Sequence, residues 1–212
     1  MTVVFDLDDT LYKEVDYLKS AYQEIAKQIG IPEAYGLLWE TWKTHGDAFG
    51  ELLSQYDISL TKSELLEIYR YHKPKIELSE GARVFLECIC EAGIYVGIIT
   101  DGRTKTQMNK MEALDILKYI DPKDIIISES FGSEKPSPKN YIHFMKSDQE
   151  CIYIADNPQK DFLAPNLLGW KTVCLLDDGR NIHPQNFDLP NEYLPQQCIK
   201  DFSNVVSILS LH

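Results

Sequence analysis

Three acidic residues, Asp6, Asp8 and Asp9, follow directly after the short apolar run Thr2–Phe5. This run of β-branched and aromatic residues is typical of a strand that is buried on both faces in a parallel sheet. In open α/β sheets, ligands bind in the crevice beyond the carboxyl ends of the strands. The sequence therefore predicts that these carboxylates lie at such a crevice and can take part in chemistry there.

The spacing of Asp6 and Asp8 suits a reaction that needs both a nucleophile and an acid. Asp6, at the end of the strand, can attack phosphorus and form an aspartyl-phosphate intermediate. Asp8 can protonate the leaving alkoxide and later take a proton from the water that hydrolyses the acyl phosphate. The hydroxyl of Thr10 can hold the turn together. Taken alone, the segment fits a solvated turn equally well, because short motifs also arise by chance.

The end of a second predicted strand and a later loop carry groups that can bind phosphate. Thr100 offers a hydroxyl, and the backbone amides of Asp101 and Gly102 can hold phosphate oxygens where negative charge gathers. Lys135 can neutralise Asp6 and the transferring phosphoryl group. Each signal is weak by itself, since Thr-Asp-Gly is an ordinary turn and a loop lysine is usually solvated.

Asp156 and Asp161 place one carboxylate at the end of another predicted strand and a second about one turn into the next helix. With Asp6 and Asp8 they bring four acidic side chains to one rim, where they would repel one another and a phosphate dianion. Mg²⁺ removes both objections because it takes hard oxygen ligands and bridges carboxylates to phosphate. We therefore expect Mg²⁺ to be held by Asp6, the backbone carbonyl of Asp8 and Asp156, with Asp161 acting directly or through water. Asn157 is the expected supporting neighbour.

The composition limits the possible partners. The chain has 212 residues, of which 44% are hydrophobic, enough for a domain with a sizeable core and a subdomain. Acidic residues outnumber basic ones by 33 to 21, and the net charge of −12 makes nucleic acid an unexpected partner. No apolar run approaches the length of a membrane span, so we expect a cytoplasmic protein without a membrane partner. The sequence leaves the oligomeric state open.

Helical periodicity fills the stretch 13–77. Hydrophobic residues recur at helical spacing between Leu18 and Ile29, and the segment from Thr61 to Glu64 is a capping box that opens a later helix. We expect this stretch to be an all-helical cap subdomain that excludes water from the site and selects substrates. The Trp and Tyr residues in it are expected to pack rather than to contact a ligand.

Strands and helices alternate in the rest of the chain, which predicts right-handed βαβ crossovers and a parallel sheet. The expected fold is α/β, with a Rossmann-like sheet in a three-layer α/β/α core formed by residues 1–12 and 78–212. The stretch 177–195 is expected to be a loop in which Arg180 and His183 are exposed. The predicted strands span 2–5, 94–99, 125–127, 151–155 and 171–176, with an edge strand at 198–199, and the predicted helices include 104–117, 158–168 and a closing helix at 203–209.

Four short motifs thus occur in order along the chain: Asp6-x-Asp8-x-Thr10, Thr100-x-Gly102, Lys135-Pro136 and Asp156-x4-Asp161. They resemble the signature motifs of the haloacid dehalogenase-like hydrolase superfamily, of the helical-cap phosphatase type, and the resemblance covers nearly the whole chain. It implies a Rossmann-like core, Mg²⁺, an aspartyl nucleophile at Asp6 and acid/base chemistry at Asp8. The chain departs from many relatives at two positions, because Asp101 stands where they have Asn and Ala155 where they have Gly.

Within this superfamily, an acid two residues after the nucleophile implies phosphoryl chemistry, since dehalogenation needs no acid for the leaving group. The resemblance therefore implies a Mg²⁺-dependent phosphatase that acts on a small phosphorylated metabolite through an aspartyl-phosphate. Two alternatives stay open. A phosphomutase or phosphotransferase would use the same site but pass the phosphoryl group to a second hydroxyl, and a binding module would keep the site without turnover. No motif in the insert identifies the substrate.

Overall fold

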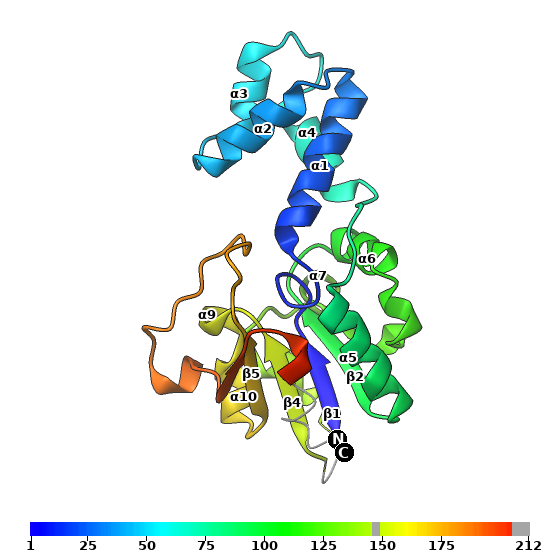
Figure 1. The fold of residues 1–212 in the computed structure, drawn as a ribbon, viewed down its shortest axis with the longest axis vertical. Coiled ribbons are helices and arrows are strands. Elements are labelled where there is room, and N and C mark those ends of the chain that lie inside the picture. Colours follow the sequence, from blue (N-terminus) through cyan, green and yellow to red (C-terminus); the bar gives the residue numbers. More distant parts are fainter. Residues whose placement is uncertain (146–148, 205–212) are drawn as a thin grey trace. The chain divides into compact units, whose positions relative to one another are not determined.

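The computed structural model describes residues 1–145 and 149–204 of the chain (Figure 1). The chain divides into two compact units, one formed by Met1–Glu14 and Glu77–His212 and the other by Val15–Ile76. In the sequence, the second unit is inserted into the first directly after the loop that follows the first strand.

Among the described residues, the first unit contains a six-stranded parallel sheet with the strand order β3-β2-β1-β4-β5-β6. The chain starts in the middle of the sheet and adds strands to either side, as in doubly wound α/β folds. The predicted α/β class is confirmed. The strands are β1 (Thr2–Phe5), β2 (Tyr95–Thr100), β3 (Ile125–Ile127), β4 (Cys151–Ala155), β5 (Lys171–Leu175) and β6 (Gln197–Ile199).

The order of the strands reverses between β1 and β4, which determines where a site can form. Phe5 lies opposite Ile154 in the parallel register, and the amide of Asp6 donates to the carbonyl of Ile154 at 3.0 Å. The residues that follow the two strands, Asp6 and Asp156, therefore leave the sheet at the same edge. Crevices at such a reversal are the usual ligand sites of these sheets.

Apolar side chains fill the interior around the sheet. All four residues of β1 are fully buried, as is Ile154 in the neighbouring strand. Gly97 in β2 leaves room for an aromatic ring, because a β-carbon at this position would lie 2.2 Å from the ring of Phe144. The rigid packing of these central strands fixes the positions of the loops that follow them.

The helix predicted at 104–117 is shorter in the structure. It is α6 (Thr104–Ala113), and a separate 3₁₀ turn follows at Ile116–Lys118. The break occurs because Asp115 adopts left-handed backbone geometry with φ of 54°, a conformation that cannot continue a right-handed helix.

The prediction of one continuous helix at 158–168 is also wrong. The segment forms two short helices, α9 (Pro158–Asp161) and α10 (Leu163–Leu167). Pro165 lacks the amide hydrogen that would bond the carbonyl of Asp161 four residues earlier. That carbonyl accepts a hydrogen bond from the Tyr141 hydroxyl instead, at 3.1 Å. The interruption leaves Asp161 at the end of α9.

The predicted loop after β5 is confirmed, and Arg180 and His183 within it are exposed. Most of the closing helix predicted at 203–209 lies outside the described residues. The remaining helices of this unit are α5 (Glu80–Glu91), α7 (Ser128–Phe131) and α8 (Pro138–Ile142), with 3₁₀ turns at Pro122–Asp124, Asn191–Tyr193 and Phe202–Asn204.

The second unit is helical, and local capping explains where two of its helices begin. The Asp47 side chain accepts from the amide of Gly50, and Thr61 forms the predicted capping box with Glu64. The helices are α1 (Glu14–Ile29), α2 (Ala34–Lys43), α3 (Ala48–Gln55) and α4 (Lys62–Tyr71).

Aromatic side chains hold these helices together. The ring centroid of Tyr69 lies 5.6 Å from that of Tyr17 and 6.3 Å from that of Phe49, which in turn lies 6.2 Å from Tyr22. The Tyr17 hydroxyl also donates to the carbonyl of Tyr69 at 2.8 Å. These rings therefore form part of the interior of the unit.

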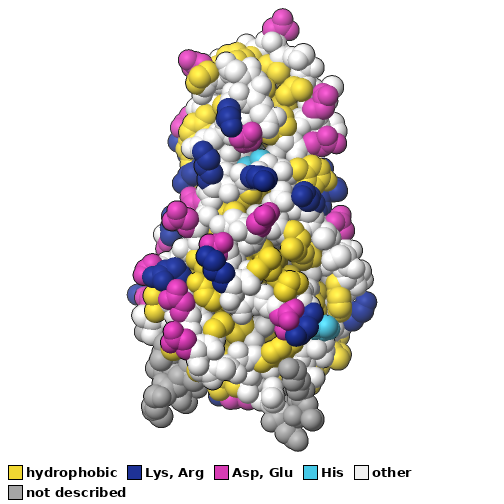
Figure 2. All heavy atoms as spheres, turned by 90° about the vertical axis from the view of Figure 1, so that its right-hand side faces the viewer, with side chains coloured by type: hydrophobic (Ala, Val, Ile, Leu, Met, Phe, Trp, Pro, Cys, Tyr) yellow, Lys and Arg dark blue, Asp and Glu magenta, His cyan; other side chains and the backbone are white. Residues whose placement is uncertain are grey.

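On the face shown in Figure 2, acidic and basic side chains are interspersed with hydrophobic ones. Charge of one sign is therefore not gathered into a single patch on this face. Within the described part of the chain, no helix has the length and apolar character needed to cross a membrane.

Candidate active site

Three carboxylates converge at the carboxyl ends of β1 and β4. Asp6 follows β1, Asp156 follows β4, and Asp161 is the last residue of α9. They are buried, with exposed fractions of 6%, 5% and 1% respectively. One oxygen from each carboxylate lies within 4.8 Å of the other two. The structure thus brings together three of the residues that the sequence predicted as metal ligands.

Asp161 is held in place by its own turn. Its Oδ2 accepts from the amide of Asn157 at 3.0 Å, and its Oδ1 accepts from the Tyr153 hydroxyl at 3.2 Å. The Asn157 side chain caps the short helix by accepting from the amide of Gln159 at 3.1 Å. Asn157 therefore contacts the carboxylate cluster through its backbone amide rather than through its side chain.

Lys135 places a cation against this cluster. Its Nζ lies 2.6 Å from Asp6 Oδ1 and 2.8 Å from Asp161 Oδ1. Although burial lowers it, the pKa of Lys135 is held well above its ordinary value by the charges of Asp161 and Asp6. One ammonium against three ionised carboxylates leaves a net charge of −2 at the cluster.

Burial, to which this excess of negative charge adds, shifts the pKa values of two of the carboxylates. Burial, together with repulsion from Asp161 and Asp8, raises the pKa of Asp6 to about 7, against the attraction of Lys135. Burial and repulsion from Asp6 and Asp161 raise the pKa of Asp156 to about 9. A further cation close to these carboxylates would favour their ionised form and lower their pKa values.

The cluster fits a hard divalent cation. Mg²⁺ prefers carboxylate and carbonyl oxygens, and a charge of +2 would balance the net charge of the cluster. Asp6, Asp156 and Asp161 are the residues that would hold it. The part of the chain that the structure describes shows no Cys or His in this group, so the donor set is that of a hard ion rather than of zinc.

Asp8, two residues after Asp6, has different surroundings. Its Oδ1 accepts from the Tyr12 hydroxyl and from Lys110 Nζ, the latter at 2.7 Å, and its Oδ2 accepts from Gln107 Nε2 at 2.9 Å. Burial alone would raise the pKa of Asp8, but the charge of Lys110 and these hydrogen bonds hold it below its ordinary value. The Asp8 side chain is therefore paired with α6 and is not one of the three converging carboxylates.

The predicted phosphate-binding turn is partly occupied by internal contacts. Thr100 Oγ1 accepts from Gln107 Nε2 at 2.5 Å, and the amide of Gly102 donates to Ser128 Oγ at 3.0 Å instead of pointing to a ligand. The Asp101 side chain accepts from the backbone amide of the lysine in the next loop, Lys135, at 3.1 Å. The extra acid at position 101 therefore anchors the backbone of the loop that carries Lys135.

Asp156 is contacted by two elements besides β4. Thr10 Oγ1 lies 3.5 Å from its Oδ1, so the Thr10 hydroxyl reaches the cluster rather than closing its own turn as predicted. Asn181 Nδ2 donates to its Oδ2 at 2.9 Å, and Gln185 Nε2 donates to its backbone carbonyl at 2.6 Å. These contacts hold both the side-chain carboxylate and the backbone carbonyl of Asp156.

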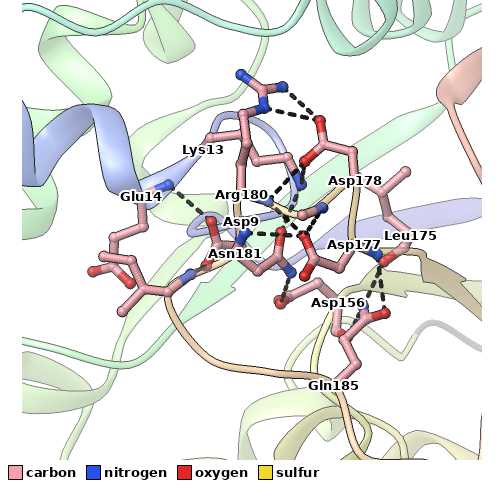
Figure 3. A network of polar contacts seen from close by, with 12 residues as sticks. Asp9, Lys13, Glu14, Asp156, Leu175, Asp177, Asp178, Arg180, Asn181 and Gln185 are labelled. Carbon is pink, nitrogen blue, oxygen red and sulfur yellow. Dashed lines mark hydrogen bonds and ion pairs between the residues drawn. The ribbon is translucent and has the colours of Figure 1, made fainter. Parts of the chain in front are cut away.

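Hydrogen bonds hold the loop that supplies Asn181 and Gln185 (Figure 3). Asp177 Oδ1 accepts from three backbone amides, including that of Asn181 at 3.0 Å. Lys13 Nζ donates to Asn181 Oδ1 at 2.6 Å, and the amide of Ile182 donates to Asp9 Oδ2 at 3.1 Å. The loop is thus bonded to the segment that follows β1 as well as to Asp156.

The carboxylates line a cavity of about 170 Å³. Two residues with cationic or titratable nitrogen atoms, Lys160 and His183, also face it, and both are exposed. The sequence predicted His183 only as an exposed loop residue. The full lining is Asp6, Asp8, Asp9, Glu14, Thr100, Asp101, Lys135, Asp156, Asn157, Lys160, Asp161 and His183.

Three further residues at the site, Lys110, Gln107 and Asn181, were not predicted from the sequence. One signal was available for the first two, because they are three residues apart on a predicted helix and therefore share a face. A polar pair on the buried face of a helix is unusual and points to a buried partner. No comparable local signal marks Asn181, because its importance depends on where a loop folds back.

A model of the haloacid dehalogenase-like hydrolase family matches residues 3–175. The chain therefore belongs to this family. Its curated relatives are phosphatases of the family. It is 29% identical over 196 residues to glyceraldehyde 3-phosphate phosphatase of Methanocaldococcus jannaschii, covering 82% of this chain and 84% of the relative. It is 31% identical over 190 residues to the enzyme of the same name from Pyrococcus abyssi, covering 81% and 79%.

Two other similarities extend this comparison. The chain is 25% identical over 199 residues to ribulose-1,5-bisphosphate 5-phosphatase of Halopiger xanaduensis, covering 81% of this chain and 82% of the relative. Its fold is similar to that of the HAD hydrolase YfnB from Bacillus subtilis, solved bound to magnesium, with a TM-score of 0.72, 19% identity and coverage of 99% and 98%. The relatives place the chain in the phosphatase class, and the solved structure supports the fold.

Proposed function

We propose that the chain is a Mg²⁺-dependent phosphatase that hydrolyses a small phosphorylated metabolite through an aspartyl-phosphate on Asp6. The observation that carries this proposal is the convergence of Asp6, Asp156 and Asp161 with Lys135 at the reversal point of the sheet. Transfer of a phosphoryl group requires a nucleophile and fixed positive charge in one crevice. This cluster supplies the nucleophile, one cation and the ligands for a second.

Asp6 acts as the nucleophile in this proposal. Its Oδ1 accepts from Lys135, whereas Oδ2 accepts no hydrogen bond from any described residue. Attack by a carboxylate oxygen forms an O–P bond and releases the alcohol part of the ester. Water then cleaves the acyl phosphate, which releases inorganic phosphate and restores the carboxylate.

Lys135 stabilises the charge that gathers on the phosphoryl oxygens. The amide of this residue is fixed by Asp101, and its Nζ is fixed by two carboxylates, so it needs no reorganisation when a substrate binds. Bound Mg²⁺, held by Asp6, Asp156, Asp161 and the backbone carbonyl of Asp8, would add Lewis-acid polarisation of a phosphoryl oxygen.

Asp8 serves the leaving group in this proposal. It donates a proton to the departing alkoxide and then accepts one from the attacking water. Because Lys110 holds the pKa of Asp8 low, the carboxylate must first take up a proton. A phosphate dianion bound beside it favours that protonation, since added negative charge raises the pKa of a neighbouring acid.

The helical unit Val15–Ile76 is the proposed cap, in place of the range 13–77 expected from the sequence. Its helices give the enzyme a second surface that can select the alcohol part of the substrate, while the sheet unit carries out the chemistry. The curated relatives are named for small phosphate esters of three to five carbons, and we propose a substrate of this class.

A panel of metabolite phosphate esters, assayed for inorganic phosphate with and without Mg²⁺, tests the proposal. We expect Mg²⁺-dependent hydrolysis of at least one ester with one phosphate released per ester consumed. Less phosphate than ester consumed would show transfer to a second hydroxyl. Absence of Mg²⁺-dependent turnover over the whole panel would contradict the proposed activity.

A further inference from the structure

Lys110 is a buried cation that the proposed chemistry does not use directly. It lies on α6 with an exposed fraction of 3%, and its Nζ is 2.7 Å from Asp8 Oδ1 and 3.5 Å from Glu14 Oε1. Its partners differ from those of Lys135, which contacts Asp6 and Asp161. The site therefore contains two buried lysines, each paired with a different set of carboxylates.

Gln107, one turn before Lys110 on the same helix, extends this contact. Its Nε2 donates to Asp8 Oδ2 at 2.9 Å and lies 2.5 Å from Thr100 Oγ1. Because the Tyr12 hydroxyl also donates to Asp8, both carboxylate oxygens of Asp8 are held by donors from two separate elements. A carboxylate held at both oxygens has one defined orientation.

Stability alone does not account for this arrangement. Burying the charged end of a lysine is costly even when it is paired with a carboxylate, and apolar residues of similar volume often stabilise a protein as well or better. The Asp8 end of the group lines the cavity that also contains Asp6 and Lys135. A buried lysine paired with a half-buried carboxylate that faces a proposed catalytic cavity is better explained by what it positions.

We propose that Lys110, together with Gln107, is a positioning residue that orients the Asp8 carboxylate toward the leaving-group oxygen and keeps it out of the metal cluster. This inference rests on the proposed function, because it assigns a role in the same reaction. In this proposal, two carboxylates of the same short loop have separate roles because they have separate partners. Asp6 stays with Lys135 and the cation ligands, while Asp8 stays with α6.

The inference predicts a selective defect. Without Lys110, Asp8 can adopt other orientations, and protonation of a poor leaving group becomes slow, whereas attack by Asp6 is unaffected. Misplacement of a reacting group by about 1 Å can cost on the order of 10²-fold. We therefore expect Lys110→Met to lower kcat for an alkyl phosphate by about 30- to 100-fold and kcat for p-nitrophenyl phosphate by less than about threefold, with KM little changed.

The control is Lys105→Met, the same substitution at an exposed position of the same helix. It should leave both activities unchanged. Lys110→Arg keeps a cation beside Asp8 and should recover part of the alkyl phosphate activity. In an Asp8→Asn background, Lys110→Met should add no further change to the ratio of alkyl to aryl turnover, because the group it positions is already disabled.

Thermal unfolding first shows that each variant is folded. Steady-state kinetics with the alkyl ester and the aryl ester then tests the positioning role of Lys110. If Lys110→Met does not fold, Gln107→Leu replaces it, since this change removes one donor to Asp8 and keeps Lys110. An equal loss on both esters, or no loss on either, would overturn the positioning role while the wild-type activity would still support a phosphatase. A wild-type enzyme that is inactive on every ester would instead overturn the proposed function and this inference with it.

Discussion

Asp6 and Asp8 lie in one loop, two residues apart, yet the protein treats them in opposite ways. Burial raises the pKa of each, but for Asp6 the net result is a pKa of about 7, whereas the pKa of Asp8 is held below its ordinary value. Asp6 shares one lysine with other carboxylates, and Asp8 has Lys110 and two further donors. Two acids whose pKa values are pushed apart by their environments are suited to different roles.

The comparison shows that positive charge is distributed unevenly over the two groups of carboxylates. The group around Asp8 has its cation within the chain, although Glu14 beside it has a pKa raised to about 8 by burial and by repulsion from Asp8. The cluster of Asp6, Asp156 and Asp161 has too little positive charge for its carboxylates. The chain therefore supplies a cation for the carboxylate of Asp8, and in the proposed function a bound cation would do the same for the cluster of Asp6, Asp156 and Asp161.

The largest effect should come from Asp6→Asn. An amide oxygen cannot form the acyl phosphate, and loss of a nucleophile can cost on the order of 10⁵-fold in kcat. We expect turnover of alkyl and aryl phosphates to fall together, together with loss of the hydroxylamine-sensitive phosphoenzyme. Asp188→Asn, at an exposed loop position, is the matched control. A variant that retains Mg²⁺-dependent turnover would remove Asp6 from the nucleophile role.

Asp8→Asn should remove the proposed general acid and leave the nucleophile Asp6 in place. General acid/base help is generally worth about 10² to 10⁴ in rate, so alkyl phosphate turnover should fall by that amount. Aryl phosphates, whose leaving groups need little protonation, should lose much less. Calorimetric titration should show Mg²⁺ binding close to that of the wild type, since the Asp8 side chain is not in the cluster. Equal losses on both kinds of ester would argue against the acid role.

Asn181→Leu should weaken Mg²⁺ binding at the cluster of Asp6, Asp156 and Asp161 without changing the surroundings of Asp8. The Asn181 amide orientation is unambiguous, because Lys13 can only donate and must therefore face its oxygen, which turns its NH₂ group to Asp156. Loss of such a supporting contact commonly weakens metal binding by about 10- to 100-fold. Mg²⁺ titration by calorimetry measures this change directly. Asn186→Leu, elsewhere in the loop, should bind Mg²⁺ normally, and an unchanged affinity in Asn181→Leu would show that the contact is irrelevant to the ion.

The parts of this molecule that the sequence predicted are those encoded locally. The run Thr2–Phe5 indicated a buried strand, and the acids placed at strand ends met in space because parallel strands end at one edge of the sheet. Thr61 and Glu64 specified a helix start that depends only on neighbouring residues. The strand and the helix start are each determined within a few residues, and the meeting of the acids follows from the general geometry of a parallel sheet.

The parts that the sequence did not predict depend on distant contacts. Lys110 meets Asp8 across 102 residues of sequence, and Asn181 meets Asp156 across 25. Both side chains belong to types that usually lie in water, so their burial becomes apparent only when the chain is folded. The break after Asp161 has a local origin, because Pro165 has no amide hydrogen to continue the helix.

The smallest effect should come from Asp101→Asn. The structure shows that Asp101 Oδ1 acts as an acceptor for the Lys135 amide, and an Asn side-chain oxygen can accept the same hydrogen bond. We therefore expect kcat to change by less than about threefold, since the loop that carries Lys135 keeps its anchor. Asp101→Leu removes the acceptor and should lower kcat for alkyl and aryl phosphates by a similar factor, about tenfold, because Lys135 acts on the phosphoryl group rather than on the leaving group. If Asp101→Asn proves as damaging as Asp101→Leu, the site requires the charge of Asp101, and the charge balance of the cluster around Asp6 would then include this fourth carboxylate.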